Sequence, residues 1–357
     1  TTGDYNVAIG FNAGAVMTTG DRSVAIGPYA LDACTTGQYN IGIGNDALGS
    51  HTTGTSNTAV GTNVMAANTT GNYNTAMGRN ALDANQTAHN NTGIGYEALG
   101  ANTTGHDNTA VGYPCLSANT TGIQNVAVGG ALPSCTTGSY NVGVGNLAMN
   151  YMTTGSGNTA VGYSAGKGSA GTTGASNTTI GAWAGTVIQS TAANNTCVGT
   201  ESGDTITTGS SNTAIGYNAG STMTTGSNNS FFGKDAGISG SPGGAITSGS
   251  NEIVIGDNEV SKVNVQVDWT VASDERDKTD FTPLDLGLDF VKALAPVTYK
   301  WDKRSKYGDK TAADYDLLDQ VPDGTHKEDW LDLGFKAQEV EALEIAAGYK
   351  IAEKTNL

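Results

Sequence analysis

The chain has 357 residues, of which 51 are glycine and only 14% are charged, and this composition is unlike that of ordinary compact domains. Its formal charge of −16 excludes a nucleic-acid binder that needs clustered Lys and Arg to displace counterions. The sequence has no run of eighteen apolar residues and no signal-peptide pattern, so we expect no membrane insertion.

Charge is unevenly distributed along the chain. Residues 1–256 contain 11 Asp or Glu and 4 Lys or Arg, whereas residues 257–357 contain the remaining 22 of 33 acidic and 13 of 17 basic side chains. We therefore expect three parts: repeats over 1–256, a connecting neck over 257–272 and a separate domain over 273–357.

A unit of 17 residues, T-T-G-x-x-N-[TV]-A-[VI]-G-x-x-A-[LG]-x-x-x, fills residues 1–256. Its second glycine recurs every 17 positions from Gly10 to Gly129 and then at looser spacing, with insertions at 164–173 and 237–248. The unit offers only short β-like runs between turn signals, so a helical repeat is excluded. The sequence predicts a mainly β protein with a parallel β-solenoid of about fifteen coils. The chain begins inside a unit at Thr1 without a methionine, so we expect it to be a processed or truncated piece.

Each unit contains an apolar run with a small residue at its centre. The residue before the second glycine is apolar and the residue two positions earlier is Thr or β-branched, so period-two alternation assigns both to the core side. A small side chain on the opposite side predicts close packing against another subunit, because one thin coil buries little apolar area. The alternative is that alanine merely tolerates a cramped corner. The small column contains Ala8, Ala25, Gly42, Ala59, Ala76, Gly93 and Ala110.

An asparagine lies three residues after the first glycine of almost every unit, with Ser23 and Glu252 as exceptions. Stacked asparagines form an amide ladder that caps the turn backbone. The sharper alternative is that this ladder binds a ligand. A calcium-binding roll needs Asp where these repeats have Asn or Thr, so we expect no metal and no cofactor. The ladder begins with Asn6, Asn40, Asn57, Asn74, Asn91, Asn108 and Asn125.

The four cysteines have no C-x-x-C spacing and no nearby histidines, which argues against a zinc or redox site. Cys34 and Cys135 share a register but lie six units apart, roughly 29 Å at ~4.8 Å per coil, which is beyond disulfide reach. We expect reduced cysteines that fill space. We interpret His51, His89 and His106 as isolated, solvated loop residues.

The string N-[TV]-A-[VI]-G-x-x-A, as in residues 6–13, resembles the head repeat of YadA-like trimeric autotransporter adhesins. The resemblance implies a left-handed parallel β-roll in which three chains pack side by side. The unit of 17 residues is longer than the repeat of that family, so we expect the extra T-T-G corner to change the cross-section of the coil.

After the repeats, Val263, Val265, Val267, Trp269 and Val271 alternate with less apolar residues. This pattern predicts a half-buried strand, which we interpret as the neck that joins the solenoid to the domain that follows.

Three further motifs lie at residues 273–280, 287–301 and 333–341. In this order they resemble the endosialidase-type intramolecular chaperone at the C-terminus of phage tail spikes and tail fibres. The resemblance implies a small α+β domain that helps a fibre to trimerise and then cleaves itself off as a Ser-Lys peptidase. It also implies a long C-terminal helix beyond Leu357, so we expect the domain to be incomplete at its C-terminus.

Carried over to this sequence, the resemblance makes Ser273 the nucleophile, Lys278 the base and Ala272-Ser273 the cleaved bond. A lysine can serve as base if desolvation lowers its pKa toward neutrality. Five residues apart, the two side chains lie on different faces of a helix or strand, so the dyad needs a bend or a neighbouring subunit. Asp277 departs from the apolar residue usual before the motif lysine. Without the resemblance, Ser273 reads as a helix N-cap.

These features favour a homotrimeric, host-adhesive tail fibre of a bacteriophage, located in the virion outside the cell. Its partners would be a host receptor or glycan and other tail proteins. The repeats hold no carboxylate pair or His/Ser/Asp set for glycan hydrolysis, so single-turnover autoproteolysis is the enzymatic activity expected.

Two alternatives remain open. A bacterial trimeric surface adhesin of the YadA-like type would share the repeats without enzymatic activity, but should carry a membrane anchor in place of the chaperone motifs. An ice-binding solenoid is suggested by the stacked T-T-G threonines, although adjacent threonines on an extended segment point to opposite faces.

Overall fold

The computed structural model describes residues 3–169, 171–189, 191–264, 287–300, 321–327, 329 and 331–346. The chain divides into two compact units, Thr1–Val260 and Ser261–Leu357. Among the residues of these ranges, no helix is long and apolar enough to cross a membrane.

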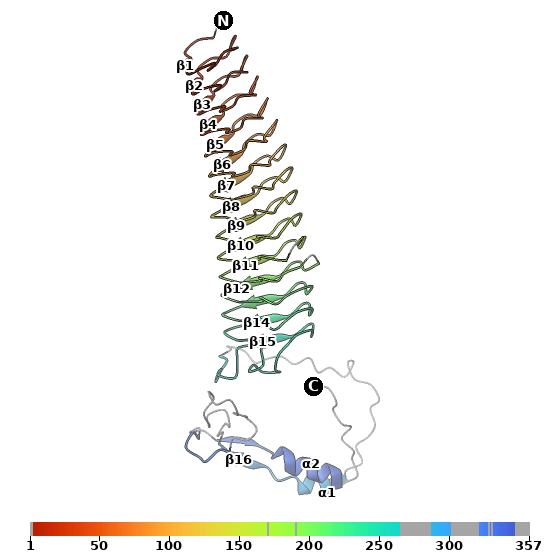
Figure 1. Ribbon diagram of the computed structural model, residues 1–357. Coiled ribbons are helices and arrows are strands. Elements are labelled where there is room, and N and C mark those ends of the chain that lie inside the picture. The colour runs from red at the N-terminus through yellow and green to blue at the C-terminus, as the bar shows by residue number, and fades with distance from the viewer. Residues whose placement is uncertain are drawn as a thin grey trace. The chain divides into compact units, whose positions relative to one another are not determined.

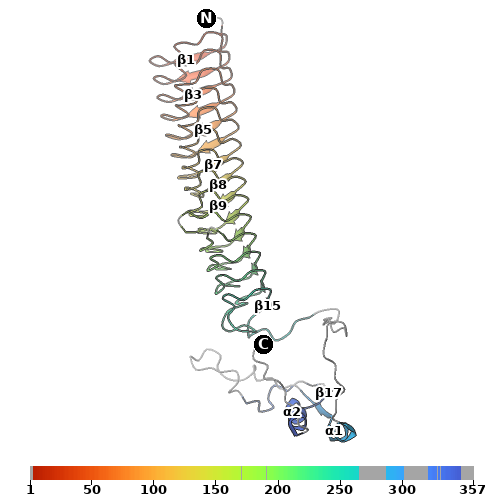
Figure 2. The same ribbon diagram turned by 90° about the vertical axis from the view of Figure 1, so that its right-hand side faces the viewer.

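The first unit is an elongated parallel β-solenoid with one short strand in each coil (Figures 1 and 2). Fifteen strands form a single sheet in sequence order, and the register is constant, so that Val7 pairs with Val24 and Thr58 pairs with Thr75. The mainly β solenoid predicted from the repeat is thereby confirmed. The strands are β1 (Val7–Ile9), β2 (Val24–Ile26), β3 (Ile41–Ile43), β4 (Thr58–Val60), β5 (Thr75–Met77), β6 (Thr92–Ile94), β7 (Thr109–Val111), β8 (Val126–Val128), β9 (Val142–Val144), β10 (Thr159–Val161), β11 (Thr178–Ile180), β12 (Thr196–Val198), β13 (Thr213–Ile215), β14 (Ser230–Phe232) and β15 (Ile253–Ile255).

Each strand ends at a glycine that no other residue can replace without strain. Gly10 has a φ of +138°, a conformation that L side chains rarely adopt. A Cβ on Gly10 would lie 2.5 Å from the carbonyl oxygen of Gly27, its counterpart in the next coil. The close stacking of the coils therefore explains why glycine recurs at this position.

The central residue of the strands, which is small in most of them, points into the solenoid, not away from it. Ala59 and Ala76 are fully buried, whereas Ile9 and Met77 at the strand ends are exposed. The prediction that the small column faces another subunit, with the flanking residues in the core, is therefore wrong. The physical reason is the narrow interior: a Cβ on Gly93 would lie 3.3 Å from Cγ of Leu82, which already fills the space beside the strand.

A leucine column fills the solenoid opposite the strands. Leu31, Leu48, Leu82 and Leu99 are fully buried, and each has a positive φ between +51° and +57°. A left-handed conformation costs a residue with a side chain about 1–2 kcal/mol. Burying the leucine stabilises the coil by about 1.5–3 kcal/mol, which offsets that cost.

The leucine position is coupled in size to the residue three positions later. Where the first is leucine, the second is smaller or polar. Where the first is Gly185, Gly203 or Gly220, the second is Ile or Met, and these side chains are buried; Met149 with Met152 departs from the rule. The exchange keeps the volume of each core layer similar, as close packing requires. The pairs are Leu31 with Cys34, Leu48 with His51, Leu82 with Asn85, Leu99 with Asn102, Gly185 with Ile188, Gly203 with Ile206 and Gly220 with Met223.

The described part of the second unit combines two helices with a pair of short strands. Helix α1 (Gly287–Ala293) precedes β16 (Val297–Tyr299), and β17 (Asp332–Gly334) precedes helix α2 (Ala337–Ala346). Strands β16 and β17 are antiparallel. Of the predicted neck strand, residues 262–264 form no strand, and residues 265–271 lie outside the described residues.

Candidate functional site

The structure brings the predicted asparagines together into a continuous ladder inside the solenoid. The backbone N–H of Asn57 donates to Oδ1 of Asn40 at 3.0 Å, and its Nδ2 donates to the same oxygen at 3.1 Å and to the carbonyl of Gly71 at 2.9 Å. Asn74 repeats this pattern on Asn57. Ser23 continues the ladder through its hydroxyl, which accepts a hydrogen bond from the backbone N–H of Asn40 in the next coil.

Each amide of the ladder bonds the coil before it and the coil after it. From Asn40 onward the predicted members are fully buried, so their hydrogen bonds are made within the solenoid. A buried amide with internal partners has no capacity left for an external ligand. The ladder is therefore a structural feature that fixes the register between coils, and the geometry does not favour the ligand-binding alternative.

Sequence reasoning missed a second amide column at the last position of the unit. Asn102 donates to Oδ1 of Asn85 at 3.2 Å, and Asn119 donates to Oδ1 of Asn102 at 2.8 Å. The signal was present, because four consecutive units end in asparagine. Asn68 begins this column, and its Nδ2 has no hydrogen-bond partner.

The interpretation of the histidines as isolated, solvated residues is wrong for His51, whereas His89 and His106 are at least partly exposed but not isolated. His51 occupies the same column as the second amide ladder, is fully buried, and places Nε2 2.9 Å from the carbonyl oxygen of Gly54. Burial lowers the pKa of His51. His89 and His106 stack on each other with ring centroids 5.2 Å apart, and His106 bonds to Asp107 at 2.7 Å.

The first threonine of each T-T-G corner forms a third ladder. The hydroxyl of Thr52 donates to the carbonyl of Thr69 at 3.0 Å, and Thr35 makes the same bond to Thr52 at 3.1 Å. These hydroxyls are used inside the stack. The first threonines are therefore not available for an exposed ice-binding array, whereas the second threonine of the corner, as at Thr36 and Thr53, is exposed.

All four cysteines are free and buried, as expected from their scattered positions. Burial raises the pKa of Cys135 to about 11 and that of Cys197 to about 12. A thiol of this kind stays protonated and unreactive. Within the described ranges, no three His, Cys, Asp or Glu side chains gather into a metal site.

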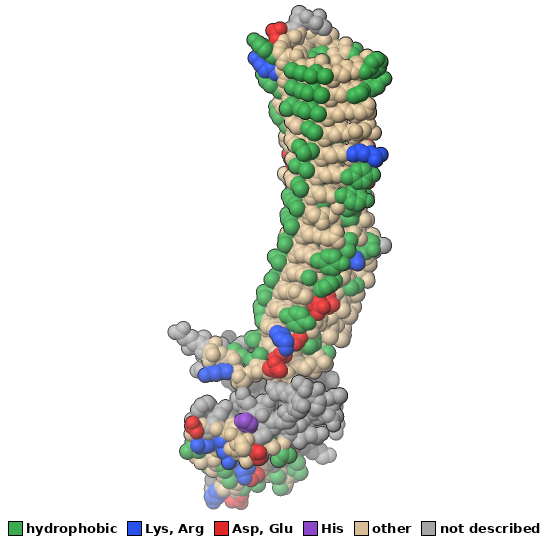
Figure 3. Space-filling model, turned by 60° about the vertical axis from the view of Figure 1, so that its left-hand side comes forward, with side chains coloured by type: hydrophobic (Ala, Val, Ile, Leu, Met, Phe, Trp, Pro, Cys, Tyr) green, Lys and Arg blue, Asp and Glu red, His purple; other side chains and the backbone are tan. Residues whose placement is uncertain are grey.

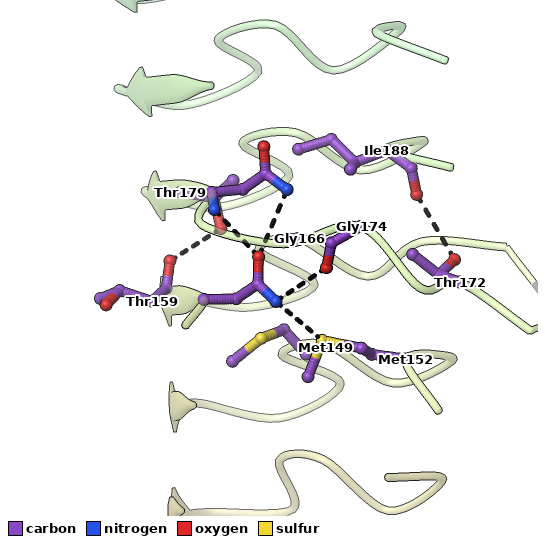
Figure 4. A pocket seen from close by; sticks show the side chains of 10 residues that line it. Met149, Met152, Thr159, Gly166, Thr172, Gly174, Thr179 and Ile188 are labelled. Atoms are coloured by element: carbon purple, nitrogen blue, oxygen red, sulfur yellow. Dashed lines mark hydrogen bonds between the residues drawn. The ribbon is translucent and has the colours of Figure 1, made fainter. Parts of the chain in front are cut away.

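A cavity of about 20 Å³ lies between the coils of β10 and β11 (Figure 4). It lies between two clusters of buried apolar residues, one ending at Ala165 and one beginning at Ala184. Met152, Thr172 and Thr179 line it. A space of this size holds about one water molecule and is far smaller than a typical ligand pocket of about 300–1,000 Å³. The cavity is therefore a packing gap and not an active site.

The outward residues of the strands form a continuous uncharged surface. We call this surface the outer sheet face; it consists of the first and third residues of β1 to β15. The third residues are all apolar, and many are exposed, as Met77 is at 46% and Ile94 at 36%. Figure 3 shows hydrophobic side chains as a stripe along this unit. A long exposed apolar stripe is typical of an interaction surface.

The structure brings together two of the three C-terminal motifs. Strand β16 belongs to the motif at 287–301 and pairs with β17, which overlaps the motif at 333–341, so that Thr298 lies opposite Leu333. Helix α2 follows directly, and Nζ of Lys336 bonds to Oε1 of Glu339 at 2.6 Å.

Comparison with known protein families gives a match in the same region. Residues 273–349 match the family described as chaperone of endosialidase. The C-terminal region carries a chaperone domain. Neither a curated protein nor a solved structure matches the chain.

The match to the chaperone family begins at Ser273, the serine of the first motif. Ser273, Lys278 and the Ala272-Ser273 bond lie outside the described residues. Their assignment as dyad and cleavage site stays a prediction from the resemblance.

Proposed function

We propose that this protein is a homotrimeric tail-fibre protein of a bacteriophage, in which the solenoid is an adhesive shaft and the chaperone domain drives assembly. The observation that carries the proposal is the chaperone match at residues 273–349, which follows the fifteen-strand solenoid in the same chain. A bacterial surface adhesin could share the repeats, but the chaperone match favours the fibre.

The outer sheet face supports the trimeric part of the proposal. It replaces the small column as the contact between subunits, because the small residues lie in the core of each solenoid. An uncharged apolar stripe as long as the sheet can be covered along its whole length by a second copy in the same register. Parallel packing of three solenoids would bury the exposed Ile, Val and Met side chains.

The maturation step proposed for the chaperone domain is autoproteolysis. The Ser273 hydroxyl attacks the carbonyl carbon of Ala272 while Lys278 takes the hydroxyl proton. The peptide bond breaks as the Ser273 amine takes that proton from Lys278 and leaves, and water then hydrolyses the ester between Ala272 and the Ser273 oxygen. The products are residues 1–272 and a released chaperone domain.

Intact-mass spectrometry after expression of the full chain tests this step. The wild type should yield a fragment that ends at Ala272, whereas Ser273→Ala and Lys278→Ala should remain at full length. Cleavage of Ser273→Ala at the same bond, or an intact wild type, would contradict the assigned dyad.

A further inference from the structure

The solenoid places its aromatic side chains on the surface. Every aromatic residue of the described repeats is exposed except Phe231, which is fully buried, while the core uses mainly Ala, Leu and Met. Rings exposed to this extent contribute less to the stability of the coil than buried ones would. Surfaces enriched in Tyr and Trp are typical of binding sites, because these side chains are apolar on one face and polar at one end.

Many of these rings lie one or two positions after the glycine that ends a strand. We call this set the aromatic column. Rings of successive coils contact each other, at centroid distances of 5.4, 5.3 and 5.5 Å. Figure 3 shows larger hydrophobic clusters beside the stripe of the outer sheet face. The three contacting pairs are Phe11 with Tyr29, Tyr96 with Tyr113, and Tyr163 with Trp183.

The cations of the repeats are already engaged. Arg22 lies 5.5 Å from the ring centroids of both Tyr5 and Tyr39, and Arg79 lies 5.9 Å from that of Tyr96. Lys167 lies over Tyr151.

The fourth cation, Lys234, pairs with Asp235 at 2.9 Å and with Asp257 at 3.5 Å. The four Lys and Arg of residues 1–256 are scattered and outnumbered by eleven Asp and Glu, and the chain as a whole is strongly negative, so this surface disfavours a polyanion.

We propose that the aromatic column binds a neutral glycan that runs along the solenoid axis. Sugar rings have apolar faces that stack on Tyr and Trp, and hydroxyl edges that bond to the polar side chains between them. The contacting pairs provide platforms that repeat along the shaft, so several weak contacts combine on one long ligand. This inference rests on the proposed adhesive function and assigns it a surface and a ligand class.

A printed array of neutral and charged microbial glycans, probed with the full chain, tests the proposal. The variant Tyr163→Ala/Trp183→Ala removes one platform, at which the two side chains are 48% and 45% exposed. The matched control is Tyr73→Ala/Tyr140→Ala, which removes two exposed tyrosines outside the aromatic column. We expect binding to neutral glycans that weakens about tenfold or more in the first variant and stays within about twofold in the control.

Light scattering on the same samples separates this proposal from the proposed function. An assembled trimer that binds only charged glycans would overturn the neutral-glycan proposal, and one that binds no glycan would also point to a protein receptor; the fibre assignment stays intact in both cases. Equal weakening in both variants would overturn the role of the aromatic column. A wild type that stays monomeric would contradict the fibre assignment itself.

Discussion

At the scale of single residues, the structure is governed by the limited volume inside each coil. Alanine or glycine occupies most strand centres because a buried leucine or methionine already fills the space beside them, whereas the large Phe231 lies against Gly220 and Gly237. The sequence period correctly placed the flanking residues on one face and the small residue on the other. The period could not show which face was inside, because alternation separates the two faces of a strand without indicating which one is buried. The size coupling of two positions, seen as Leu31/Cys34 in one coil and Gly185/Ile188 in another, does indicate which face is inside.

The size coupling can be tested in one coil by a double-mutant cycle. Leu31→Gly removes a buried side chain and should destabilise the solenoid by about 2–5 kcal/mol. Cys34→Ile alone overpacks the layer and should cost about 1–3 kcal/mol. Together they recreate the pair Gly185/Ile188. The double variant should therefore lose about 0.5–3 kcal/mol less free energy of unfolding than the sum of the two single losses. Guanidinium unfolding followed by circular dichroism measures this, and additive losses would refute the coupling.

At the scale of the coil, three ladders of polar side chains join each strand-and-turn element to the next. The first amide ladder could be predicted because Asn40, Asn57 and their equivalents recur at a fixed offset. The second was missed, although the same argument applies to the last residue of the unit. His51 was mispredicted because it was considered as a single residue. Its position in the repeat, which it shares with Asn68, predicts burial.

Burial of His51 predicts an acid-labile coil. Because burial lowers its folded pKa, the unfolded state takes up the proton first as the pH falls below about 6.5. The contribution of neutral His51 to stability is therefore fully present above that pH and is lost as the pH drops toward the pKa of the folded state. His51→Asn, which extends the column of Asn68, should remove this loss.

Urea midpoints of the wild type and of His51→Asn at pH 7.5 and pH 5 measure the effect. Asp204 has a pKa raised to about 6, chiefly by burial and then by Glu201, so it titrates in the same range with the opposite sign. The contribution of Asp204 is the same in the wild type and in His51→Asn, so it cancels in the difference between them. Parallel declines in both proteins would show that His51 does not control the acid response.

At the scale of the whole molecule, the chain joins a fifteen-strand solenoid to a chaperone domain, for which we propose a role in assembly. The fold of the repeats followed from their period, and the chaperone domain followed from three motifs in order. What could not be predicted is the surface between subunits, because it depends on which strand residues point outward. The exposure of Met77 and Ile94 is the reason why we propose the outer sheet face as that surface.

The native mass of the assembled protein, measured by light scattering after size exclusion, tests the central claim most directly. We predict three copies for the wild type and for the control Thr62→Lys, which changes an exposed residue outside the outer sheet face. Met77→Lys/Ile94→Lys should keep the circular dichroism of the solenoid but shift the mass toward one copy, since two charges per chain would be buried at the contact. A monomeric wild type, or a trimer unaffected by the two lysines, would contradict the account.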